Sequence, residues 1–107
     1  MKKSRHAEKR IRERVGVGKK GSDRLVEDLQ RDGIPLHRLK GNLHRWVISV
    51  IRGGGRGFDG RIKPFIFRNY LYVTGNSGDV IITVIPIPQN LVKNLKGYIK
   101  EETNEEN

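Results

Sequence analysis

The sequence contains no cysteine, which excludes a disulfide framework and any metal site built on thiolate ligands. It also has no long apolar run, because the longest, Val80 to Pro88, is about half as long as a membrane-spanning helix has to be. Met1 is followed by charged residues where a signal peptide would have its apolar region. We therefore expect a soluble, cytoplasmic protein with no membrane partner.

Acidic residues are scarce compared with basic ones. The 107 residues include 22 Lys and Arg against 12 Asp and Glu, which gives a formal net charge of +10. The excess is confined to residues 1–68, with 19 basic and 7 acidic residues, whereas residues 69–107 have 3 and 5. Solubility needs a much smaller charge, so the imbalance favours a polyanionic partner. Nucleic acid is favoured over an anionic membrane because no strongly apolar amphipathic helix accompanies the charge.

A chain of this length with 35% hydrophobic residues can form one modest core. We assign residues 1–100 to a single basic α+β domain. Residues 101–107, EETNEEN, form an acidic tail without apolar side chains and are expected to be disordered.

The spacing of apolar residues predicts a first helix over residues 4–15, with Ser4 as N-cap and a buried stripe at Ala7, Ile11 and Val15. The adjacent stripe, which borders the buried face, consists of His6, Arg10 and Arg14.

Two further helices are expected. Residues 22–32 have helical spacing between an N-cap at Ser22 and a C′ stop at Gly33, and residues 89–100 have a weaker helical pattern. The run LHRWVISVIR, residues 43–52, is rich in Val and Ile and lacks helix start and stop signals, so we predict a strand.

A β-hairpin is predicted next, with strands over residues 65–74 and 80–87 joined by a turn from Gly75 to Gly78. The expected fold is therefore α+β, with two N-terminal helices packed on a small antiparallel sheet of three to four strands and a short C-terminal helix.

The two faces of this hairpin are expected to differ. An even-numbered loop places Tyr72 opposite Ile81 and Tyr70 opposite Thr83. One face is apolar and should receive the helices. The other face carries Ile66, Arg68, Tyr70, Tyr72 and Thr74, with Thr83 across from them. This second face is either an ordinary solvated sheet face or a ligand surface.

The segment from Gly53 to Lys63, GGGRGFDGRIK, combines five glycines with basic residues and one aromatic residue. It is either a mobile connector or a nucleic-acid-binding loop. In the second case Arg56 and Arg61 contact phosphates and Phe58 stacks on a base.

Neither a metal site nor a cofactor is expected, because the carboxylates lie on predicted exposed helix faces or loops and the three histidines form no ligand pair. Metal-free RNA cleavage needs only a base, an acid and fixed positive charge at the phosphate. His6 or His44 can act as acid or base near neutral pH. The arginines that can hold phosphate are Arg10, Arg45 and Arg68.

The motif His6-Ala7-x-x-Arg10, with Glu13 and Arg14 closing its pattern and a last strand VIITVI, resembles small toxin-like proteins of the barnase, colicin E5/D and RelE superfold. It is similar above all to an uncharacterised branch in which a His-Ala-x-x-Arg helix precedes such a sheet. The resemblance implies a metal-independent ribonuclease whose catalytic residues are His6, Arg10 and Thr83. Many members of this superfold have lost catalysis, so the resemblance supports RNA binding more than turnover.

We therefore expect a protein that binds RNA, in preference to DNA, and cleaves it without metal. The residues expected to contact nucleic acid are Arg45, Arg56, Phe58, Arg61, Arg68, Tyr70 and Tyr72. One alternative is a non-catalytic nucleic-acid-binding module, and another is a small phage or mobile-element regulator that binds an acidic host protein. Since the first helix packs on the apolar face, His6 has to reach around the sheet edge to meet Tyr70 and Thr83.

Overall fold

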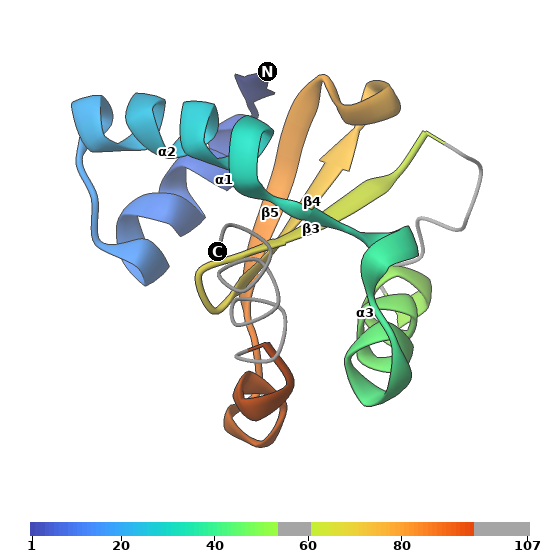
Figure 1. The fold of residues 1–107 in the computed structure, drawn as a ribbon. Helices are drawn as coiled ribbons and strands as arrows, with labels where there is room; N and C mark the ends of the chain where they lie inside the picture. The colour runs from blue at the N-terminus through green and yellow to red at the C-terminus, as the bar shows by residue number, and fades with distance from the viewer. Residues whose placement is uncertain (54–60, 96–107) are drawn as a thin grey trace, which may run out of the picture.

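The chain forms an α+β fold in which helices cover both faces of one five-stranded sheet (Figure 1). The computed structural model describes residues 1–53 and 61–95. The expected α+β class is confirmed. The sheet has more strands than the three to four predicted, and it is mixed because its first strand runs parallel to its last.

The elements in chain order are β1 (Lys2–Lys3), α1 (Arg5–Arg10), the π-helical η1 (Ile11–Val15), α2 (Lys19–Asp32), β2 (Ile34–Pro35), the 3-10 turn η2 (Leu36–Arg38), α3 (Gly41–Gly53), β3 (Lys63–Phe67), β4 (Tyr70–Gly75), the 3-10 turn η3 (Asn76–Gly78) and β5 (Val80–Pro86). The strand order is β1-β5-β4-β3-β2. Residues 89–95 are also helical, in agreement with the start of the predicted C-terminal helix. The rest of that helix and the predicted tail, residues 101–107, lie outside the described residues.

The predicted first helix is present as the continuous pair α1 and η1. Ser4 is its N-cap, and the Ser4 hydroxyl accepts a hydrogen bond of 3.0 Å from the backbone N–H of Ala7. The helix ends at Gly16, whose φ of +78° lies in the left-handed region that glycine adopts without strain. Ala7 and Ile11 are fully buried against the sheet. The polar stripe next to them therefore borders the sheet.

Helix α2 begins at Lys19, so the prediction that Ser22 is its N-cap is wrong. Ser22 is buried inside the helix, and its hydroxyl accepts a hydrogen bond of 2.9 Å from Lys3 Nζ. Gly33 follows the helix as expected, but its backbone is extended, with φ at −62°. Glycine fits this position because a Cβ would lie 2.6 Å from the backbone oxygen of Leu29.

Residues 41–53 form helix α3, and the prediction of a strand over residues 43–52 is wrong. The many β-branched residues of this run favoured a strand. Its apolar residues nevertheless recur at helical spacing, and Leu43, Val47 and Ile51 are buried together against the sheet. Burying this stripe outweighs an intrinsic β preference that spans only about 1 kcal/mol.

The predicted hairpin is a three-stranded meander of β3, β4 and β5. Arg68 and Asn69 both have positive φ values, 52° and 69°, and form the two-residue turn between β3 and β4. Arginine rarely adopts this conformation, so the sequence carries little signal for a turn there. The continuous strand predicted over residues 65–74 is therefore interrupted.

The pairing between β4 and β5 also differs from the prediction. Tyr72 pairs with Val84 instead of Ile81. A register shift between Val73 and Thr74 accompanies this pairing, as expected for a β-bulge, which places an extra residue in one strand. The turn length alone does not predict such an insertion.

Both faces of the sheet are buried, so the predicted exposed face is absent. Tyr72 is fully buried in the cluster that joins β3, β4 and β5 to α1, η1 and α2. Ile66 and Leu71, on the opposite face, are buried in a second cluster with α3 and residues 89–95. Thr74 and Thr83 are buried as well. Helix α3 packs on this second sheet face, and the sequence prediction did not include that helix.

Candidate nucleic-acid interface

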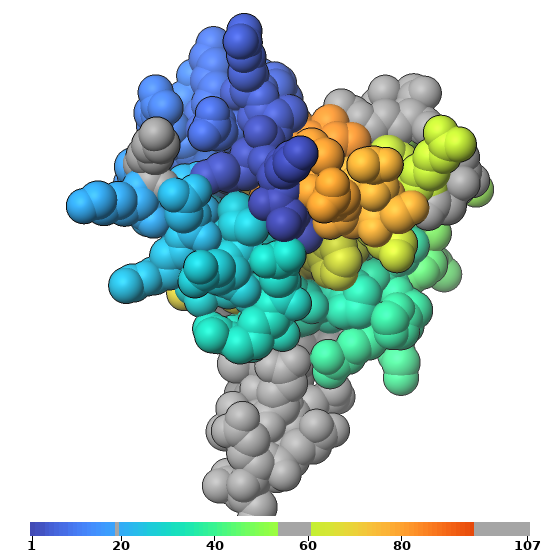
Figure 2. Space-filling model, turned by 90° about the horizontal axis from the view of Figure 1, so that it is seen from above, coloured from blue at the N-terminus to red at the C-terminus, as the bar shows by residue number. Residues whose placement is uncertain are grey.

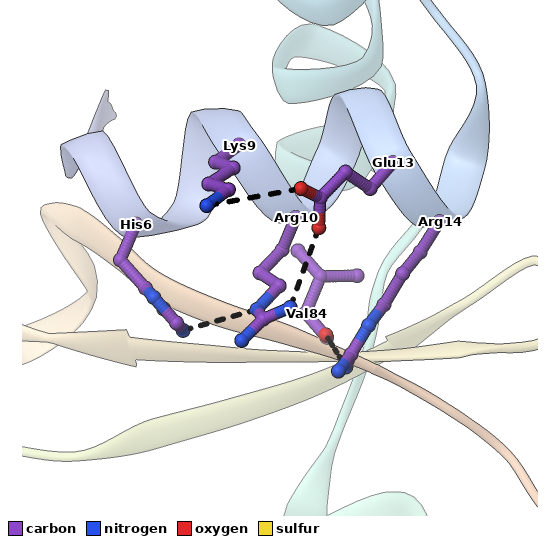
Figure 3. Close-up of polar contacts among 6 residues, drawn as sticks. All are labelled: His6, Lys9, Arg10, Glu13, Arg14 and Val84. Atoms are coloured by element: carbon purple, nitrogen blue, oxygen red, sulfur yellow. Dashed lines mark hydrogen bonds and ion pairs between the residues drawn. The ribbon is translucent and has the colours of Figure 1, made fainter.

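A row of polar side chains on α1 and η1 lies beside β5 (Figure 3). His6 Nε2 accepts a hydrogen bond of 3.5 Å from Arg10 Nε, and Arg10 Nη1 lies 3.3 Å from Glu13 Oε2. Lys9 Nζ lies 3.9 Å from the same carboxylate. Spacings of three and four residues place these groups next to one another on a helix. The structure therefore brings together His6 and Arg10, two of the three predicted catalytic residues.

Arg14, the next residue of this row, ties the helix to the sheet. Its Nη1 donates a hydrogen bond of 2.6 Å to the backbone oxygen of Val84, and its own backbone oxygen accepts one of 2.6 Å from the Tyr70 hydroxyl. Strand β1 pairs with β5 only at Val80 and Ile81. Further along the same edge of β5, the backbone oxygen of Val84 is bonded to the Arg14 side chain instead of to a strand. Figure 2 shows the N-terminal segment, in dark blue, lying beside the orange residues of β5.

The His6 and Arg10 pair has the chemistry of a phosphate site with a base beside it. The guanidinium of Arg10 can hold a phosphate through two parallel hydrogen bonds. Its contact with Glu13 is a surface ion pair worth at most about 1 kcal/mol, so a phosphate can replace the carboxylate. His6 is exposed, and an imidazole nitrogen can serve as a general base or acid. Sequence reasoning did not include Glu13 in the site, although its position three residues after Arg10 is a usable signal.

Thr83 does not join this pair. It is only 6% exposed and pairs with Val73 in the sheet. Successive side chains of a strand point to opposite faces. Since Val84 belongs to the cluster under α1 and α2, Thr83 faces the other side, toward α3. The three predicted catalytic residues are thus divided between the two faces of the sheet.

Arg68 lies at the turn between β3 and β4. Its guanidinium carbon lies 4.8 Å from the centre of the Phe67 ring, and its Nη2 lies 3.6 Å from Asp28 Oδ2. The Arg68 side chain is 68% exposed, so it can still reach a phosphate. Tyr70 is half-buried, and its hydroxyl is already bonded to Arg14.

Tyr72 is fully buried, so the prediction that it lies on an exposed face is wrong. Its hydroxyl has no hydrogen-bond partner among the described residues. Burial raises the pKa of Tyr72 above the ordinary tyrosine value, and the nearby Tyr70 raises it further. The ring belongs to the core and offers no surface on which a base can stack.

The remaining predicted contacts lie elsewhere. Arg45 is exposed on α3, which packs on the sheet face opposite to α1, and Arg61 is exposed shortly before β3. Arg56 and Phe58 lie outside the described residues. Those predicted nucleic-acid contacts that the structure describes therefore do not form one continuous set with His6 and Arg10.

A pocket of about 520 Å³ lies between α3 and the start of β3, and we call it the β3–α3 pocket. Leu36 and Ile62 contribute apolar surface to it, and its other lining residues include His37 and His44. Sequence reasoning missed this pocket because the predicted strand over residues 43–52 placed His44 in a sheet. The helical spacing of the apolar residues in that run is the signal that would have corrected it.

Within residues 1–53 and 61–95, no group of three or more His, Asp or Glu side chains is arranged to hold a metal ion. Among these same residues, no helix has both the length and the apolar character needed to cross a membrane.

No protein-family model matches this chain, and neither a curated protein nor a solved structure matches it significantly. The class of molecule is therefore defined by its own features: a strongly basic α+β protein with an exposed histidine and arginine pair on its first helix.

Proposed function

We propose that this protein binds RNA through the polar row of α1 and η1 and cleaves it without a metal ion. The observation that carries the proposal is the contact of 3.5 Å between His6 Nε2 and Arg10 Nε at the protein surface. In this contact a group that can accept a proton lies beside a guanidinium that can bind phosphate, within a protein of formal net charge +10.

The roles follow from the chemistry of RNA cleavage. His6 takes the proton of the 2′-hydroxyl, and the freed oxygen attacks the adjacent phosphorus. The bond from phosphorus to the 5′-oxygen breaks, and that oxygen takes a proton from water. Arg10 stabilises the additional negative charge on the phosphate in the transition state. RNA phosphate displaces Glu13 from Arg10 when it binds.

One observation favours a second candidate, a non-catalytic RNA-binding module. Thr83 is buried on the opposite face of the sheet, so only two of the three residues implied by the ribonuclease resemblance lie together. Such a module would use the same arginines to position the RNA backbone and would not need His6 as a base.

Incubation of total RNA with the purified protein in EDTA separates these candidates. We expect cleavage by the wild type, a loss of at least about a hundredfold in His6→Ala, the scale of a general base, and full activity in the control Arg24→Ala. Arg24 is exposed on α2 and leaves the His6 and Arg10 pair intact. Intact RNA at high protein concentration would leave the binding module as the function.

Salt titration tests RNA binding itself, in both candidates. Affinity for a single-stranded oligonucleotide should fall linearly in a log–log plot, with a slope of about −0.7 for each phosphate neutralised. Arg10→Ala should weaken binding and make this slope shallower. An affinity that does not respond to salt would contradict nucleic-acid binding and favour a protein partner.

A further inference from the structure

The β3–α3 pocket forms where the sheet loses its edge strand. Strand β2 pairs with β3 only through Ile34 and Pro35, and the chain then turns into η2. Among the described residues, no strand pairs with β3 at Lys63 on that side, and helix α3 closes the space from one sheet face. The result is a concave site on an element other than the one that carries His6.

The lining combines flat and apolar groups with groups that bind anions. Leu36 and Ile62 supply apolar surface, and His37, His44 and Lys63 supply imidazole rings and an ammonium group. Its volume of about 520 Å³ is within the range of small-molecule sites, roughly 300 to 1,000 Å³. Imidazole rings are platforms on which nucleobases stack.

The charge around the pocket indicates an anionic occupant. None of the described residues that line it is acidic. Lys63 gives the lining a positive charge, and the imidazole N–H groups of His37 and His44 can donate hydrogen bonds to an anion. A purely apolar ligand gains nothing from this charge, whereas a ligand with a planar ring and a phosphate matches both parts of the lining.

We propose that the β3–α3 pocket binds one nucleotide of single-stranded RNA, with the base on the apolar surface and the phosphate at His37, His44 and Lys63. This rests on the proposed function, and it names a second contact for the same RNA on the sheet face opposite to α1. The strand has to be single because the bases of a duplex are stacked on one another and cannot enter a pocket.

Titration of the full-length protein, followed by NMR of its backbone amides, tests the pocket directly. The probes are uridine 5′-monophosphate and adenosine 5′-monophosphate, with uridine and inorganic phosphate as their separate parts. We expect the largest chemical-shift changes at the amides of His37, His44 and Lys63. These changes should be larger with a nucleotide than with uridine or inorganic phosphate alone.

Variants then measure how much the pocket contributes. The double variant His37→Ala/His44→Ala should bind nucleotide at least about tenfold more weakly, on the scale of hydrogen bonds to a charged group. Lys63→Glu provides a second test through charge, in case the double variant does not fold. Arg24→Glu on α2 is the matched charge control and should bind nucleotide like the wild type.

The outcomes separate the two proposals. Two results would overturn a nucleotide site in the pocket: chemical-shift changes at α1 instead of the pocket, or changes of equal size with inorganic phosphate alone. Neither result would contradict RNA binding at His6 and Arg10. Unchanged RNA affinity in both pocket variants also overturns it. Failure of the wild type to bind an RNA oligonucleotide at low salt would instead overturn the proposed function, whatever the pocket binds.

Discussion

The hydroxyl of Tyr70 donates a hydrogen bond of 2.6 Å to the backbone oxygen of Arg14, a residue 56 positions earlier in the chain. This bond joins β4 to η1, and Arg14 in turn donates to Val84 of β5. The position of the first helix beside the sheet therefore depends on a contact between residues that are far apart in sequence. The His6 and Arg10 pair is held in place through the same helix.

Removing this hydroxyl should destabilise the protein. Tyr70→Phe keeps the ring and loses only the bond to Arg14, so we expect a decrease of about 1 kcal/mol in the free energy of unfolding. Chemical denaturation monitored by circular dichroism measures it. An unchanged midpoint would mean that the bond does not contribute to holding η1 on the sheet.

The matched substitution Tyr72→Phe should not lower the free energy of unfolding as Tyr70→Phe does. The Tyr72 hydroxyl is buried without a partner among the described residues, so its removal relieves a desolvation cost. We expect stability to be unchanged or raised, by up to about 1 kcal/mol. A clear loss of stability in the same denaturation experiment would show that this hydroxyl has a bonding partner.

The raised pKa of Tyr72 also predicts how stability depends on pH. Below the ordinary tyrosine pKa of about 10, the side chain is protonated in both the folded and the unfolded state, and stability is unaffected. Above that value the unfolded chain loses the proton while the folded protein keeps it, so the free energy of unfolding falls as pH rises. The wild type should therefore lose stability above about pH 10 more steeply than Tyr72→Phe. Parallel curves for the two proteins would contradict this.

Gly33 is predicted to be intolerant of a side chain. A Cβ there would lie 2.6 Å from the backbone oxygen of Leu29 and 3.0 Å from Leu29 Cδ1. We expect Gly33→Ala to cost about 1 to 3 kcal/mol of stability, since backbone has to move to relieve the contact. Gly53→Ala is the control, because a Cβ at Gly53 meets nothing within 4 Å. Equal thermal midpoints for both variants would contradict the close approach.

Leu43 and Arg45 lie two residues apart on helix α3, one buried and the other exposed. Leu43→Ala should cost about 2 to 5 kcal/mol, because Leu43 is fully buried. Arg45→Ala should change stability by less than about 0.5 kcal/mol, because Arg45 is exposed. If Arg45 contacts phosphate, its removal should reduce RNA affinity and make the salt dependence shallower. Comparable destabilisation by both variants would contradict the helical placement of residues 41–53.

The parts of the fold that depend on local signals could be predicted from the sequence. Ser4, Ala7 and Ile11 define a helix start and a buried stripe, and the structure has both. The stripe next to them places His6 and Arg10 together through helical spacing alone, which is why this half of the candidate site was predictable.

The remaining features depend on tertiary contacts. The turn at Arg68 and Asn69 is imposed by pairing of β3 with β4 and contradicts the preference of arginine for negative φ. The bulge near Thr74 changes which residues of β5 face Tyr72. The β-branched residues of 43–52 predict a strand where the structure has helix α3, so the sequence indicates neither the cover over the sheet face that includes Thr83 nor the β3–α3 pocket.

The arginine that covers β5 at Val84 has a consequence for contacts between molecules. An exposed strand edge is a template on which another chain can add a strand. Here the backbone oxygen of Val84 is already bonded to Arg14, and Pro86 has no N–H to offer. Arg14 and Pro86 together protect this edge from intermolecular strand addition, and replacing Arg14 should make the protein more prone to aggregate.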